Sequence, residues 1–415
     1  MQPIHTHAPM AGPTPTPTPT AVAEAAGDYW HRRGLPTDPD HVVAAPTAPL
    51  LLLALLAAAC GDDGRGGVVV PRPGAAWHAE QARLLGLPLH TVPVPAECGG
   101  VPDSVALLEA VSRARADGGD PRVLVLSVAD DVTGTTAPPE ILHEVCEAAT
   151  REGLLIISDE SLRDTLHDPH DTVIVSPAEI MHCAGPVASA GTRPEGAPGT
   201  GPRTPATPTT SAAAGRSVVV LADLGADPGA DPRPGPGVGV ARLPAGAGPH
   251  GGETGDRTRA VLNALRARLD GPRTTAAVRA LTEPRALRER RAAAGRAHGA
   301  LAAALHRVLT DAGAVCRPPN VGRHLYPDFE ALRPDLAARG IEDAPRLEAA
   351  LVRRLGPHVL GGHRFGDDPG ALRVRLSTDV RPPGVRPDHP DRVDRPEAAE
   401  TSAAVASALA GLTAG

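Results

Sequence analysis

The sequence has 415 residues, enough for roughly two or three domains, and its 41 basic and 48 acidic residues give a net charge of −7. Because positive and negative residues are interspersed, the charge pattern argues against nucleic acid or an anionic membrane as a partner. The sequence contains no lysine, so every basic residue is Arg and no side chain can form a Schiff base with an aldehyde or a ketone.

The cysteines and the N-terminal region carry information about the cellular compartment. The five cysteines lie too far apart in the sequence to form a zinc site or a redox pair, so we expect reduced thiols and no bound metal. Residues 1–27 lack the basic start and apolar stretch of a secretory signal, and the apolar run at 49–60 is too short to span a bilayer. These features predict a cytoplasmic protein without a membrane partner.

Strand-like and helix-like segments alternate along the first part of the chain. A Pro/Thr-rich tail at 1–27 is predicted to be disordered, and residues 29–34 have the pattern of a helix end closed by Gly34. Strands are predicted at 41–43, 67–70, 89–92, 122–127 and 154–158, with helices at 49–60, 77–85, 103–116 and 138–152. Most of these strands are continuous apolar runs, which is typical of burial on both faces. The order predicts an α/β domain with a mainly parallel sheet.

The second part of the chain is less regular. Residues 184–216 are almost entirely Ala, Gly, Pro, Thr and Ser, and we expect a disordered linker there. A strand at 217–221 and a Gly/Pro/Asp-rich stretch at 225–239 precede a helical region at 257–314, a helix at 346–355 and a half-exposed strand at 372–377. The predicted division is therefore a large domain at 28–290 interrupted by the linker, a small α/β domain at 291–380, and a loop with a helical tail at 381–415.

Seven segments follow one another in an order that one protein family shares. They are YWHRRGLPTDP at 29–39, VVPRP at 69–73, DDVTGT at 130–135, SDE at 158–160, LYPDF at 325–329, GHRFGDDP at 362–369 and RVRLS at 373–377. This series resembles the class I/II aminotransferases of fold type I, which use pyridoxal phosphate (PLP), and is closest to actinobacterial members. The resemblance implies a mainly parallel large-domain sheet sandwiched by helices, a smaller α/β C-terminal domain, PLP as cofactor, and a homodimer.

The resemblance also assigns roles to particular positions. The family's PLP-binding Lys falls near Gly225, or near Gly229 if the extra residues are counted from the other side, and neither glycine can replace it. Asp159 matches the carboxylate that pairs with the pyridine nitrogen, and Thr47 matches the phosphate site at a helix N-terminus. Asp131 stands where the family has an Asn that donates a hydrogen bond to the cofactor's phenolic oxygen, and an ionised Asp only accepts and should repel that oxygen. Arg375 matches the Arg that binds the substrate's α-carboxylate through a planar fork.

Several of these residues have an equally good structural interpretation. Asp159 can cap the turn that follows its strand, Thr47 can cap the helix at 49–60, and Arg375 can form a solvated pair with Arg373 on one strand face. Further departures from the family surround the missing Lys. The positions of an aromatic ring, a Tyr and a phosphate-binding Arg are occupied by Ala75, Leu162 and Gly237.

The residues leave three functions open. The first is an aminotransferase-family protein that lacks the Schiff-base Lys, binds PLP noncovalently at best, cannot transaminate by the usual mechanism, and forms a homodimer or pairs with an intact paralogue. The second is a repurposed amino-acid- or keto-acid-binding protein, or a PLP-independent enzyme, that uses Asp159 and Arg375 to hold a small carboxylate-bearing ligand. The third is an amino-acid aminotransferase, as the family resemblance implies. A decaying coding region with little stable structure is a further alternative.

Overall fold

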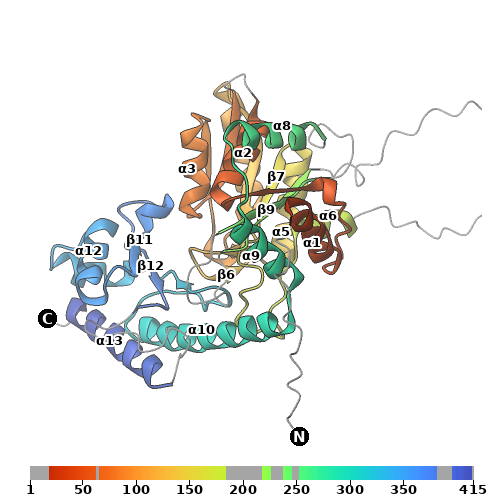
Figure 1. The fold of residues 1–415 in the computed structure, drawn as a ribbon. Helices are drawn as coiled ribbons and strands as arrows, with labels where there is room; N and C mark the ends of the chain where they lie inside the picture. The colour runs from red at the N-terminus through yellow and green to blue at the C-terminus, as the bar shows by residue number, and fades with distance from the viewer. Residues whose placement is uncertain are drawn as a thin grey trace, which may run out of the picture.

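The computed structural model describes residues 18–61, 65–183, 217–225, 237–244, 252–380 and 395–413. They form a large domain built on a seven-stranded sheet and a small domain built on a three-stranded sheet (Figure 1). The predicted linker at 184–216 and the predicted loop at 381–394 lie outside the described residues, as do residues 1–17 of the predicted tail.

The central sheet of the large domain has the strand order β1-β9-β8-β7-β4-β2-β3. Its strands are β1 (Val42–Ala45), β2 (Gly66–Arg72), β3 (Leu89–Pro93), β4 (Asp120–Ser127), β7 (Leu155–Asp159), β8 (Val218–Asp223) and β9 (Gly239–Arg242). All neighbouring strands are parallel except those that pair with β9, so the predicted mainly parallel sheet is confirmed. A two-stranded hairpin, β5 (Ala129–Asp130) and β6 (Thr135–Thr136), follows β4.

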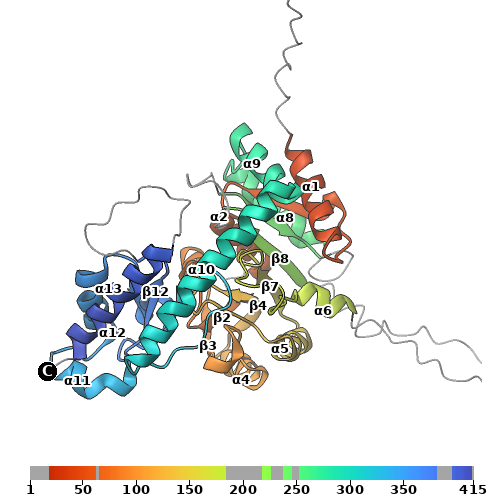
Figure 2. The same cartoon turned by 90° about the horizontal axis from the view of Figure 1, so that it is seen from below.

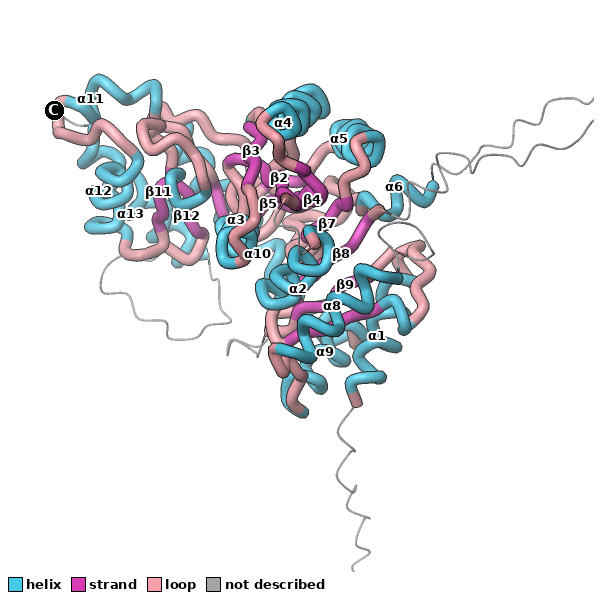
Figure 3. The backbone as a smooth tube through the Cα atoms, turned by 90° about the horizontal axis from the view of Figure 1, so that it is seen from above, coloured by secondary structure: helices cyan, strands magenta, loops and turns pink. Residues whose placement is uncertain are grey.

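Helices cover both faces of this sheet (Figure 3). One layer contains α2 (Ala48–Cys60), α3 (Ala76–Leu84) and α8 (Gly252–Ala264), and the other contains α1 (Pro19–His31), α4 (Ser104–Ala116), α5 (Pro139–Arg151), α6 (Pro177–Cys183) and α9 (Gly271–Thr282). Two short 3-10 helices, η1 (Pro39–His41) and η2 (Ala96–Cys98), connect these elements. The strands β4, β7 and β8 are buried on both faces by aliphatic side chains, as the continuous apolar runs predict.

The small domain contains an antiparallel sheet with the order β10-β12-β11. Its elements are α10 (Arg285–Asp311), β10 (His324–Leu325), η3 (Glu330–Leu332), α11 (Arg333–Ala337), α12 (Ala344–Leu355), β11 (Val359–Gly361), η4 (Gly362–Phe365), β12 (Val374–Ser377) and α13 (Arg395–Thr413). The long helix α10 runs from the large domain into the small one (Figure 2). The predicted division at residue 290 therefore falls inside a continuous helix.

The N-terminal segment differs from the prediction. The chain is helical from Pro19 onward, so the expectation of a disordered tail up to residue 27 is wrong for residues 19–27. The Thr18 side chain accepts a hydrogen bond from the backbone N–H of Ala21, and a proline at the first helical position is preorganised for the helix. Tyr29 and Trp30 are buried in the core and stabilise the helix. The Pro/Thr repeat before Pro19 hides the start of this helix in the sequence.

The region predicted as helical at 257–314 is divided into three helices, α8, α9 and α10. Asp270 caps α9 through the N–H of Arg273, and Pro284 is the N-cap residue just before α10. Because proline lacks an amide hydrogen, it favours a helix start over a helix interior.

Candidate functional site

The carboxyl ends of the central strands bring the predicted site residues to one edge of the sheet. Ser127, at the end of β4, lies opposite Asp159, at the end of β7, and Asp159 lies opposite Leu221 in β8. The turn after β5 carries Asp131 toward the small domain. Ligands of open α/β sheets bind at this kind of edge, so the positions given by the family resemblance converge on one region.

Asp159 is buried and both of its carboxylate oxygens accept hydrogen bonds. Oδ2 lies 2.9 Å from Nε2 of His78, and Oδ1 accepts from the N–H of Ser161 at 3.0 Å and from its Oγ at 2.5 Å. The side chains of Asp159 and His78 are 8% and 3% exposed. Asp159 therefore caps the following turn, as its structural interpretation predicts, and it also holds a histidine of α3 that no sequence motif places there.

Asp131 and Arg375 form an ion pair that joins the two domains. One Arg375 Nη donates to Asp131 Oδ2 at 2.6 Å, while His324 Nδ1 lies 3.0 Å from Asp131 Oδ1. The Arg375 guanidinium carbon also lies 4.5 Å from the centre of the Phe365 ring. Burial raises the pKa of Asp131, but the hydrogen bond of His324 and the charges of His324 and Arg375 outweigh it and lower this pKa to about 2.

This arrangement corrects two expectations. The carboxylate of Asp131, expected to repel a cofactor oxygen, is instead neutralised by Arg375, because the packing of the small domain brings β12 against the turn after β5. The interpretation of Arg375 and Arg373 as a solvated pair is wrong. Arg373 donates to Asp328 at 2.7 Å and to Asp367 at 3.1 Å, so the two guanidinium groups have separate carboxylate partners.

Thr47 is the N-cap of α2. Its Oγ accepts a hydrogen bond from the N–H of Leu50 at 3.3 Å, as the helix-cap interpretation predicts. The start of β9 packs against the first turn of this helix, where a Cβ at Gly239 would come within 2.6 Å of the Cα of Ala48. A glycine is required there because the two backbones touch, and the role of Thr47 toward a phosphate stays a prediction.

Gly225, one of the two positions expected for the Lys, lies against Gly237, the position expected for the phosphate-binding Arg, whereas Gly229 lies outside the described residues. Gly225 follows β8, its N–H donates to Asp223 Oδ1 at 2.8 Å, and a Cβ built on it would lie 2.8 Å from the Cα of Gly237. Burial raises the pKa of Asp223. Neither glycine offers a side chain, and a side chain at Gly225 would need the neighbouring backbone to move.

These residues do not fit a covalently held PLP. A glycine replaces the Schiff-base Lys, Ala75 replaces the stacking ring, and the carboxylate that would pair with the pyridine nitrogen already binds His78. Among the described residues there is also no group of three or more His, Cys, Asp or Glu side chains placed to hold a metal ion. In the part of the chain that the structure describes, no helix is both long and apolar enough to cross a membrane.

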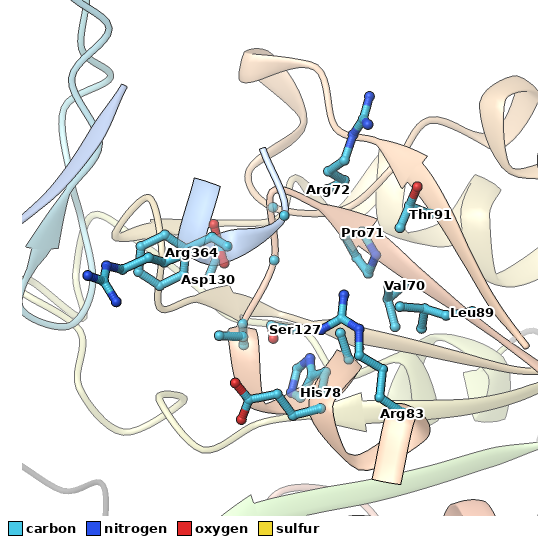
Figure 4. A pocket seen from close by; sticks show the side chains of 18 residues that line it. Val70, Pro71, Arg72, His78, Arg83, Leu89, Thr91, Ser127, Asp130 and Arg364 are labelled. Atoms are coloured by element: carbon cyan, nitrogen blue, oxygen red, sulfur yellow. The ribbon is translucent and has the colours of Figure 1, made fainter. Parts of the chain in front are cut away.

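A cavity of about 60 Å³ lies beside this region, between α3, the end of β2 and the 3-10 helix η4 of the small domain (Figure 4). His78, Ser127 and Asp130 form part of its wall, and Arg83 enters it from α3. Asp130 is buried and accepts hydrogen bonds from the N–H of Val132 and from the N–H and Oγ of Thr133. Burial raises the pKa of Asp130, although these hydrogen bonds act in the opposite direction.

Comparisons with known proteins support the family resemblance. Residues 5–189 match the family model described as aminotransferase class I and II. A search of curated proteins found no match. The resemblance predicted from the order of the motifs is confirmed, whereas the closeness to actinobacterial members stays a prediction.

Solved structures of aminotransferases share the fold across most of this chain. Aspartate aminotransferase of Thermus thermophilus with maleate is 18% identical, with 94% of this chain and 81% of that chain covered and a TM-score of 0.68. A probable N-succinyldiaminopimelate aminotransferase, also from Thermus thermophilus, is 20% identical, with 94% and 84% covered and a TM-score of 0.66. An aromatic aminotransferase from Pyrococcus horikoshii is 15% identical, with 94% and 85% covered and a TM-score of 0.68.

Proposed function

We propose that this chain, which shares the fold of the class I/II aminotransferases and their family model over residues 5–189, does not transaminate by the usual covalent mechanism. Its function is instead to hold a small carboxylate-bearing ligand, such as an amino or keto acid, without a covalent bond to PLP. A homodimer, or a heterodimer with an intact paralogue, and a cytoplasmic location are parts of the same proposal.

The observation that carries this proposal is the absence of lysine. Only a Lys side chain supplies the amine for a Schiff base with PLP, and the sequence has none. The alternative, an authentic amino-acid aminotransferase, needs that amine. The close approach of Gly225 to the backbone of Gly237 supports the proposal further, because the expected position has no room for a long side chain.

Arg375 is the proposed anchor for the ligand's carboxylate. Its guanidinium lies at the junction between the domains, stacked near Phe365, and it presents the planar fork that carboxylates bind. Asp131 holds the same guanidinium in the structure described above. A ligand carboxylate must therefore displace the carboxylate of Asp131 from Arg375 or share the guanidinium group with it.

Mixing the purified protein with PLP is expected to give no aldimine on a side chain and no side-chain adduct after borohydride reduction, since there is no lysine and the α-amino group is the remaining amine. Absorbance titration and intact-mass measurement check this result, with a lysine-containing family member treated in parallel as the positive control. A stable adduct with one PLP per chain on an internal residue, located by peptide mapping, would overturn the proposal and favour the authentic aminotransferase.

Replacing Asp131 by Asn is expected to raise the affinity for pyruvate by about tenfold, or about 1.4 kcal/mol. The neutral amide no longer neutralises Arg375, and it removes the repulsion between two carboxylates at the same guanidinium. Isothermal titration calorimetry at constant ionic strength measures the change.

The matched control for this variant is Asp328→Asn, which removes a partner of Arg373 and leaves Arg375 untouched. It is expected to bind pyruvate like the wild type, and Arg375→Gln is expected to lose binding. Equal affinities of Asp131→Asn, Arg375→Gln and the wild type would exclude Arg375 as the anchor.

A further inference from the structure

The cavity beneath α3 presents polar atoms that have no partner in the described part of the chain. Arg83 makes no hydrogen bond or ion pair there, and Figure 4 shows its guanidinium group turned into the space near His78 and Ser127. Nδ1 of His78 and Oγ of Ser127 also have no hydrogen-bond partner among the described residues, although both side chains are buried. None of these three residues has a part in the carboxylate site proposed at Arg375.

The partner of His78 determines what its free ring nitrogen can do. Nε2 faces a carboxylate oxygen of Asp159, which accepts hydrogen bonds, so Nε2 carries the proton in the neutral ring. Nδ1 then has a lone pair and accepts a hydrogen bond. With this tautomer the cavity wall combines a cation that can fork onto a carboxylate, Arg83, with an acceptor, Nδ1 of His78, and Ser127 adds a hydroxyl that can donate or accept.

Four other charged residues line the cavity: Arg72, Glu80, Asp130 and Arg364. Glu80 is an exposed carboxylate on α3. Asp130 accepts three hydrogen bonds from its own turn, and Arg364 is held by Glu348 at 2.7 Å. Arg72 is exposed and extends away from His78 in Figure 4. Arg83 is therefore the cation placed to meet an anion inside the cavity.

We infer that this cavity binds a small carboxylate that carries a hydrogen-bond donor on the neighbouring carbon, with its carboxylate on Arg83 and its donor on Nδ1 of His78. The volume of about 60 Å³ admits about four to six water-sized positions, which matches a ligand the size of lactate or glycine. A 2-hydroxy acid and an α-amino acid share this chemistry, because a hydroxyl and an ammonium group both donate. Ligands without the donor cover Nδ1 of His78 without giving it a hydrogen bond, which costs affinity.

The test compares lactate and glycine, which carry the donor, with propionate and pyruvate, which lack it. Calorimetric titration of the full chain at constant ionic strength is expected to show at least tenfold tighter binding of lactate, of glycine, or of both, than of propionate. Arg83→Gln is expected to weaken that binding tenfold or more, while the matched control Arg72→Gln changes it less than twofold. The titrations of the wild type also identify the donor group of the ligand. Binding of lactate indicates a hydroxyl group, and binding of glycine indicates an ammonium group.

Arg83 is exposed and unpaired in the described structure, so its replacement should leave the fold intact, and Ser127→Ala gives a second variant inside the cavity. Equal losses in Arg83→Gln and Arg72→Gln, binding of propionate as tight as that of lactate, or no binding of lactate and glycine would overturn the inference. Loss of lactate binding in Arg375→Gln with full binding in Arg83→Gln would also overturn it, but would leave the carboxylate site at Arg375 standing. Pyruvate binding that depends on Arg375 tests that site separately.

Discussion

Replacing Glu283 by Gln is expected to lower the free energy of unfolding by about 3 kcal/mol, because it removes the charge at the centre of a buried cluster of ions. Glu283 lies between α9 and α10, its side chain is 9% exposed, and it accepts from Arg33 at 2.7 Å, from Arg291 at 3.3 Å and from Arg32 at 3.2 Å. Without its charge, the two largely buried guanidinium groups of Arg33 and Arg291 share the carboxylate of Asp164. Gln preserves the shape of the side chain at a position with φ of 49°, so backbone strain is unchanged.

The measurement is urea unfolding of the wild type and the variant, followed by circular dichroism. The control is Glu289→Gln, which removes the charge from an exposed pair with Arg285 whose side chains are 61% and 86% exposed. Its expected cost is about 0.5 kcal/mol or less. Equal stability of the two variants would show that the cluster adds nothing to the free energy of folding. A cooperative transition of the wild type would also count against a decaying coding region.

Acidification from pH 6.5 to pH 4 is expected to remove about 3 kcal/mol of stability through His298 alone. His298, on α10, has its Nδ1 3.0 Å from Oγ of Thr378, and burial together with the charge of Arg323 lowers its pKa to about 4. The unfolded chain, with an ordinary histidine pKa of about 6.5, binds a proton in this range that the folded chain does not. Stability therefore rises with pH between 4 and 6.5 and is fully present above that window.

Besides Arg323, three neighbouring charged or titratable groups act on the pKa of His298. Asp379 raises its pKa, whereas His167 and His324 lower it. Burial also lowers the pKa of His167, so that histidine contributes acid sensitivity of the same sign. The carboxyl groups Asp131 and Asp379 have lowered pKa values, so their stabilisation is lost at more acidic pH, below their ordinary range near 4.

Thermal or urea unfolding measured between pH 4 and pH 7 tests this prediction. His298→Gln cannot take up a proton and is expected to flatten the pH dependence in this window, leaving the parts contributed by His167 and His90, whose pKa values burial also lowers. His143→Gln is the control, because it changes a histidine on α5 that is 42% exposed. A pH dependence in His298→Gln as steep as that of the wild type would rule out the assigned role.

The buried central strands and the start of α1 show where sequence patterns are informative and where they are not. The apolar runs that became β4, β7 and β8 are predicted correctly because burial on both faces demands continuous aliphatic residues. The start of α1 is missed because Thr18 and Pro19 occur within a Pro/Thr repeat, where a helix cap has the same letters as a flexible tail. Packing of Trp30 in the core decides between the two.

The candidate site, too, has features that the sequence predicts and features that only the packing decides. Asp159 and Asp131 follow neighbouring parallel strands, whose carboxyl ends meet at one edge of the sheet, and this much can be expected from the order of the strands. Arg375 arrives at Asp131 from β12 of the small domain, which only the packing of the two domains decides. The partners of these residues are not encoded nearby. His78 reaches Asp159 across 81 residues of sequence, and Arg375 reaches Asp131 across 244.

The sequence by itself determines what chemistry is excluded and which fold class is built. A chain without lysine cannot form a Schiff base, and alternating apolar strands and helices produce a mainly parallel sheet, whatever the packing of individual side chains. The tertiary structure alone decides how the remaining charges are used. Strands and domains must pack before Asp159 meets His78 or Asp131 meets Arg375, and the same packing leaves Arg83 facing a cavity with no partner among the described residues.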